Sequence, residues 1–306
     1  MKKLIIVFIL FYCSIGSHAQ NGKINAEDLP VLEQLEDTLG LLAFLIVNDS
    51  IPEDRFAATK KMIPTLVKAL KIKNSFHYPF EQLRTVSIQY PPDSTFRVFT
   101  WQLYVDIDDY RYYGAIQMNT PDLKLFPLID RSRNVVSEEQ DILQPDNWFG
   151  ALYYNLHQFD TPNGRQYLMF GFNGHSFFNK KKLVDVLQIK DGKATFGSPV
   201  FVQLDSLTGI ETIRNRLVLE YSAESSIRLN YDETFKQIMY DHLIVMGGGY
   251  DQGPTNVPDG SYEAYRLGKD GRWHWVEKVF NQVSDEPPRP APILGKDKKD
   301  IFGNNN

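Results

Sequence analysis

The sequence predicts a mainly β protein, in which an antiparallel β-meander domain, either propeller-like or a sandwich, follows an N-terminal helical hairpin. Apolar residues recur at helical spacing between residues 26 and 72. From residue 79 onward, runs of β-branched and aromatic residues are separated by Asp, Asn, Gly and Pro. No strong helical period returns before the end of the chain, which favours antiparallel hairpins over β-α-β crossovers.

The first 19 residues have the order of a secretory signal peptide. Lysines at positions 2 and 3 precede an apolar run over residues 4–12, and the sequence SHA at 17–19 provides a small-residue cleavage site. The apolar run is shorter than the roughly 20 residues that a membrane-spanning helix needs. We therefore expect a secreted or periplasmic bacterial protein, cleaved near Ala19, with no membrane span in the mature chain.

Two alternatives for this segment have less support. An uncleaved anchor would be followed by a stop-transfer pattern, and none follows. Attachment of lipid at Cys13 would require a small residue just before it, where Tyr12 stands. Cys13 is the only cysteine, so the mature chain is expected to be held by its core rather than by disulfides, which suits a bacterial periplasm.

The exported protein is accordingly expected to begin at Gln20. Because the signal peptide would be removed during export, N-terminal sequencing or the intact mass of the exported product measures this directly. Residues retained before Gln20, or lipid on Cys13, would contradict the prediction.

Residues 20–78 are predicted to form the helical hairpin. Leucines at positions 29, 32, 35, 39 and 42 recur every three or four residues, and a second apolar stripe begins at Met62. Between the stripes, the sequence NDSIPEDRF offers capping residues, and Pro52 suits a first helical turn that continues with acids. The leucine stripe could face a partner, but packing on the protein's own core explains it equally well.

Residues 79–283 are predicted to form the antiparallel β domain, with short polar turns between strands. The stretch 132–148 is polar and contains Pro145, so we expect a long surface loop there. The predicted strands are 85–90, 95–105, 110–118, 123–129, 150–159, 165–172, 182–189, 194–202, 216–222, 226–231, 236–246, 261–267 and 272–280.

One internal similarity bears on the choice between propeller and sandwich. The sequence KDGK at 190–193 is echoed by KDGR at 269–272, and each is followed at the same spacing by a Val-Phe pair. Two propeller blades of about 40 residues each would produce such an offset. Asp-Gly is also a common hairpin turn, so the similarity leaves both architectures open.

The C-terminal residues 284–306 are rich in proline and charge and contain little to bury, which predicts a disordered tail. The formal net charge is −5 and becomes more negative once the two N-terminal lysines are removed. No basic run is interleaved with aromatics. Nucleic acid is therefore not an expected partner.

Known catalytic and metal-binding patterns find little support in the sequence. Asp106 and Asp108 would share a strand face, but the glycine and the downstream carboxylate of a calcium loop are missing. The histidines lack zinc-ligand spacing. His175 and Ser176 are neighbours without a nucleophile elbow. We expect no metal, no cofactor and no catalytic residue that can be named from sequence.

The sequence DHLIVMGGGYDQGPTNVPDGSY, residues 241–262, is the strongest candidate for an interaction surface. It cannot be a phosphate loop, because the residues after the three glycines cannot begin a helix. We expect a strand followed by a long glycine-hinged loop over residues 247–260. Long loops in compact domains are often functional. The predicted partner-binding residues are Tyr250, Asp251, Asn256 and Tyr262.

These observations favour a non-catalytic binding or envelope interaction module whose partner is an envelope protein or a glycan. The tryptophans could stack on sugar rings, although core packing explains them as well. The alternative is a secreted hydrolase acting on carbohydrate, because its two catalytic acids can be distant in sequence and would not be visible as a motif.

Overall fold

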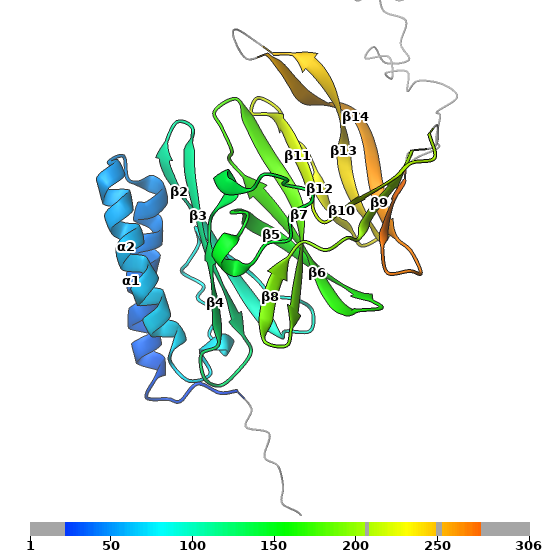
Figure 1. Ribbon diagram of the computed structural model, residues 1–306. Coiled ribbons are helices and arrows are strands. Elements are labelled where there is room, and N and C mark those ends of the chain that lie inside the picture. Colours follow the sequence, from blue (N-terminus) through cyan, green and yellow to red (C-terminus); the bar gives the residue numbers. More distant parts are fainter. Residues whose placement is uncertain (1–21, 206–207, 249–252, 277–306) are drawn as a thin grey trace, which may run out of the picture.

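The computed structural model describes residues 22–205, 208–248 and 253–276 of the 306-residue chain. The predicted signal peptide and tail lie outside these residues. Figure 1 shows four successive layers: a helical pair, then three β-sheets. The mainly β, antiparallel fold class with N-terminal helices is therefore confirmed. The domain boundaries remain predictions.

The helical layer consists of α1 (Leu29–Asn48) and α2 (Pro52–Leu70). Each helix has a proline in its first turn, where the missing N–H costs no hydrogen bond. Leu32 and Leu39 of α1 and Met62 and Leu66 of α2 are buried in a shared core. Within the described residues, no helix combines the length and the apolar character needed to cross a membrane.

The first sheet has the order β1-β2-β3-β4, and all its pairings are antiparallel. In β2, Phe99 and Trp101 pack on the helices, while Phe96 and Val98 pack on the next sheet. This alternation follows from the period of two along a strand. The strands are β1 (Ser87–Gln89), β2 (Phe96–Asp106), β3 (Asp109–Met118) and β4 (Leu125–Ile129).

The middle sheet has the order β11-β7-β6-β5, with β8 also paired to β7. It is buried on both faces. In β7, Leu183 and Leu187 face the first sheet, whereas Val184 and Val186 face the third. Such strands are expected to have nearly continuous apolar sequences. The strands are β5 (Leu152–Thr161), β6 (Gly164–Asn173), β7 (Asn179–Lys190), β8 (Lys193–Phe196) and β11 (Leu217–Ser222).

The third sheet has the order β10-β9-β15-β14-β13-β12, and β15 and β9 form its one parallel pair among the described residues. Its strands are β9 (Phe201–Leu204), β10 (Glu211–Arg214), β12 (Leu229–Asp232), β13 (Gln237–Gly247), β14 (Pro254–Leu267) and β15 (Trp273–Val276). The stacked sheets are sandwich-like, and the propeller alternative is not confirmed. The two Asp-Gly turns of the internal similarity connect β7 to β8 and β14 to β15.

The structure corrects several local predictions. The predicted strand 194–202 is two strands in different sheets, because Gly197 has φ +97° and redirects the chain. The stretch 132–148 contains the short 3-10 helices Ser132–Asn134 and Pro145–Asn147, and its Leu143 and Trp148 are buried. It is therefore not only a surface loop. A further 3-10 helix, Ser75–His77, follows α2.

The long loop predicted over residues 247–260 is also wrong. β14 begins at Pro254, which pairs with Gly247 of β13, so residues 254–260 belong to a strand; residues 249–252 lie outside the described residues. The prolines at 254 and 258 and the glycine at 260 suggested loop chemistry. They are tolerated because the hairpin projects beyond the body of the sheet (Figure 1).

Candidate functional site

A trough between α2 and the outer face of β3 and β4 is the candidate functional site. The cavity measures about 710 Å³ and is lined by residues between Ile63 and Asn134. A second cavity of about 370 Å³ adjoins it and shares Ile63 and Tyr113. We call the two cavities together the α2–β4 trough. Each of the two cavities is in the size range of small-molecule sites.

The trough exists because the helical layer is narrower than the sheet beneath it. Both helices pack chiefly on β2, which leaves the outer face of β3 and β4 without a helical cover. On that face, Tyr113 lies opposite Ile129 and Ala115 lies opposite Pro127. These side chains, with Leu125 from the start of β4, form an apolar floor.

The wall is one side of α2. Ile63, Leu66, Val67 and Leu70 recur at helical spacing and line the cavity. Phe56, one turn from the N-terminus of α2, lines the adjoining cavity. The sequence therefore gives α2 apolar residues both toward its core and toward the trough.

Charged side chains gather at one end of the α2–β4 trough. Asp109, Arg111, Asp130, Arg131 and Arg133 all line it there. Arg133 forms an ion pair with Asp109 at 2.6 Å. The guanidinium of Arg111 lies over the ring of Phe56, 5.5 Å from its centroid, in a cation–π contact.

The phenol of Tyr113 is a neutral group on this floor. Burial raises its pKa above the usual value, and the positive charge of the nearby Arg111 opposes that rise. At neutral pH the hydroxyl is therefore protonated. The ring stacks on that of Trp101, its cross-strand partner, with centroids 5.7 Å apart and an interplanar angle of 13°.

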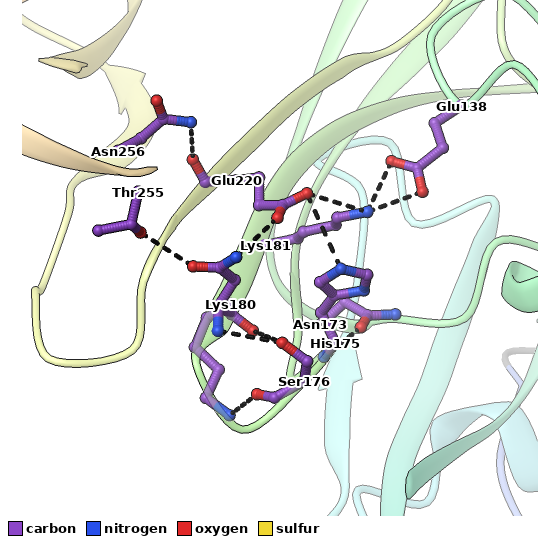
Figure 2. Close-up of polar contacts among 10 residues, drawn as sticks. Glu138, Asn173, His175, Ser176, Lys180, Lys181, Glu220, Thr255 and Asn256 are labelled. Carbon is purple, nitrogen blue, oxygen red and sulfur yellow. Dashed lines mark hydrogen bonds and ion pairs between the residues drawn. The ribbon is translucent and has the colours of Figure 1, made fainter. Parts of the chain in front are cut away.

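A second polar cluster lies at the turn between β6 and β7, and Figure 2 shows its contacts. Lys181 Nζ lies 2.8 Å from Glu138 and 3.4 Å from Glu220. The other carboxylate oxygen of Glu220 accepts a hydrogen bond from Asn179 at 3.0 Å. Because both oxygens of Glu220 are engaged, the cluster fastens the 132–148 stretch to β7 and β11.

His175 belongs to this cluster but forms no strong ion pair at neutral pH. Its Nε2 lies 3.8 Å from Glu220. Burial lowers the pKa of His175, and the nearby ammonium of Lys181 lowers it further. The imidazole is therefore neutral at pH 7. The backbone of His175 has φ +46°, in the left-handed region, and its N–H donates to Asn173 Oδ1 at 2.7 Å.

The structure places two of the four predicted partner-binding residues. Asn256 lies in β14, and its amide donates to the backbone oxygen of Glu220 at 2.9 Å, so it links the third sheet to the middle sheet (Figure 2). Tyr262 also lies in β14, half-buried, with Arg228 6.0 Å from its ring. Tyr250 and Asp251 lie outside the described residues. The partner-binding role of these four residues remains a prediction.

Sequence reasoning missed the trough residues, because their signal is weak. Phe56, Ile63 and Val67 lie on the side of α2 away from its main stripe, where a helix packed on one core would carry polar residues. That extra apolar side was the available signal. As for metals, the described residues contain no cluster of three or more His, Cys, Asp or Glu side chains that could hold an ion.

Comparison with known protein families, curated proteins and solved structures finds no match for this chain, so its function is argued from the geometry above.

Proposed function

We propose that the protein is a non-catalytic binding module of the cell envelope or secreted fraction, and that the α2–β4 trough binds a ligand with an apolar body. The observation that supports this proposal most is the trough itself, whose main cavity measures about 710 Å³ and has an apolar floor and wall. A cavity of this size with a few polar groups at one end is the usual form of a ligand site.

The driving force for such binding is burial of apolar surface. Ile63 and Ile129 are 39% and 44% exposed, although each belongs to an otherwise packed element. Covering such surface contributes about 25 cal/mol for each Å² removed from water. An apolar ligand that fills the trough would cover both side chains and gain this free energy. A polar ligand would lose its own hydration against them without a compensating interaction.

Replacing Ile63 with glutamate is expected to weaken binding of an uncharged apolar dye, N-phenyl-1-naphthylamine, at least tenfold. The new carboxylate would lose hydration when the dye enters, at a cost of about 1.4 kcal/mol or more. Dye fluorescence titration measures the affinity. The exposed position of Ile63 leaves the fold little affected.

Leu41→Glu is the matched control. Leu41 lies on α1, is 61% exposed and does not line either cavity of the trough. The substitution makes the same change in charge on the other helix, so dye binding should equal that of the wild type. If the wild type does not bind the dye, or if Ile63→Glu binds it as tightly, the proposed function is wrong.

A further inference from the structure

The charged end of the α2–β4 trough has more positive than negative charge. Three guanidiniums and two carboxylates line it, and both carboxylates are already engaged. Asp109 pairs with Arg133. Asp130 accepts hydrogen bonds from the backbone N–H of Tyr112 at 3.0 Å and from Ser132, through its N–H at 2.9 Å and its hydroxyl at 2.7 Å.

Arg111 and Arg131 are the two guanidiniums left over. Among the described residues, neither has a carboxylate within 4.0 Å. Arg111 lies in β3 and Arg131 lies two residues after the end of β4, and both line the same cavity. Two guanidiniums that line one cavity repel each other, and an anion bound in that cavity would relieve the repulsion. A guanidinium is also suited to carboxylate and phosphate groups, because it offers a planar fork of donors.

The geometry of the floor distinguishes an alkyl chain from a peptide. The floor is a face of the sheet, not its edge, so it presents side chains rather than backbone hydrogen-bonding groups. An extended peptide would bury its own N–H and C=O groups there without partners, whereas an alkyl chain has none to satisfy. The edge of β4 is also occupied near its end, where Trp148 N–H donates to Ile129 O at 3.0 Å.

We propose that the ligand is an anionic amphiphile, a long alkyl chain with one carboxylate or phosphate group, whose anion binds between Arg111 and Arg131. This inference rests on the proposed function, because it assumes that the trough is the ligand site. The wall from Phe56 to Leu70 is on the order of 20 Å long at 1.5 Å per helical residue, which gives the chain an apolar path away from the two arginines.

Displacement of N-phenyl-1-naphthylamine tests the inference with amphiphiles of one chain length. Hexadecanoate and the monophosphate ester of hexadecanol carry the two anionic groups, and hexadecan-1-ol is the neutral reference. At least one anion is expected to displace the dye at a concentration tenfold or more below that of the alcohol. The tighter of the two anions identifies the source of the anionic group.

Arg111→Gln and Arg131→Gln are each expected to weaken the anion about tenfold and to leave the alcohol unchanged. Arg84→Gln is the matched control, because Arg84 is exposed and does not line the trough, so it removes the same charge elsewhere. This control should leave both affinities unchanged. A general effect of net charge would instead weaken the anion in this variant too.

Each failure has a distinct outcome. If the alcohol and both anions displace the dye equally, the role of the arginines is wrong while the proposed function survives. If no amphiphile displaces a dye that does bind, or if an acidic amphipathic peptide displaces it at a lower concentration than hexadecanoate, the alkyl-chain assignment is wrong. If the dye itself does not bind, the proposed function fails first.

Discussion

Asp185→Ala is expected to lower the free energy of unfolding by about 3–5 kcal/mol, because it leaves a buried guanidinium without its counter-charge. Asp185 and Arg216 both have fully buried side chains, and Arg216 Nε lies 3.0 Å from Asp185 Oδ2. Neither group can turn toward water. The loss corresponds to a fall in melting temperature of roughly 6 to 20 °C for a protein of this size.

The pair belongs to a longer polar chain between the first and middle sheets. Trp148 Nε1 donates to the hydroxyl of Tyr153 at 2.8 Å, and the negative charge of Asp185 acts on that phenol. Burial, followed by the charge of Asp185, raises the pKa of Tyr153 well above its usual value, so the phenol stays protonated as a donor. Asp185→Ala therefore also removes the negative charge that acts on this hydroxyl.

A double replacement separates the cost of a lone charge from the worth of the pair. Asp185→Leu with Arg216→Met exchanges the two charges for apolar side chains of similar size, and most of the lost stability should return. Urea denaturation followed by linear extrapolation measures both variants. A loss below about 1 kcal/mol for Asp185→Ala would show that water reaches Arg216, contrary to the burial described here.

Arg97→Met is expected to cost at least about 3 kcal/mol, although Arg97 has no ion pair among the described residues. The side chain is fully buried and donates to four acceptors. These are Gln117 Oε1 at 2.8 Å, Tyr78 O at 2.6 Å, the Tyr90 hydroxyl at 2.9 Å and Ser75 O at 2.8 Å. Each buried acceptor left without a donor costs about 1–3 kcal/mol.

The contacts of Arg97 explain why its replacement is expected to lower the free energy of unfolding so strongly. Burial lowers the pKa of the guanidinium, and the hydroxyl of Tyr90 opposes this, yet an arginine remains protonated in proteins. The aromatic rings of Phe80 and Phe99 lie 5.0 and 4.7 Å from the guanidinium carbon. Arg97 therefore joins the stretch after α2 to the first sheet through backbone acceptors and ring faces instead of carboxylates.

Arg165→Met is the matched control for Arg97→Met. Arg165 has two ion pairs, with Asp93 and Asp160, each at 3.1 Å, but its side chain is 43% exposed. Exposed ion pairs contribute little to stability, so the free energy of unfolding of Arg165→Met should stay close to that of the wild type in the same urea experiment. If Arg165→Met proved the more damaging of the two, ion pairing rather than burial would govern the stability of this protein.

Much of the fold was predictable because the chain's local patterns agree with it. The helical spacing before residue 72 predicted α1 and α2, and the apolar run at 165–172 predicted β6, which is buried on both faces. The errors arose where tertiary pairing overrides local chemistry. Pro254 and Pro258 look like loop residues, but β13 pairs with both of them. The strand 211–214 was not predicted, since its polar sequence gives no strand signal.

The candidate site was the least predictable part, for a physical reason. A trough is the space between elements, and its lining residues are ordinary apolar and basic side chains in each element taken alone. That Arg111 and Arg131 line one cavity depends on the pairing of β3 with β4, and the missing helical cover depends on where α1 and α2 dock. Neither relationship is written in a local motif.

The order in which the chain adds strands to its sheets affects how the protein folds and which of its residues can vary. The chain builds β5 to β8 in the middle sheet, crosses to the third sheet for β9 and β10, and returns to add β11 before crossing again. A fragment ending at Leu204 would lack β11, leaving the edge of β7 without its neighbour. The middle and third sheets are thus expected to fold as one cooperative unit.

The trough, by contrast, is built wholly from residues between 56 and 134. Its contacts are closer in sequence and can form earlier, and its lining can vary without disturbing the crossing strands.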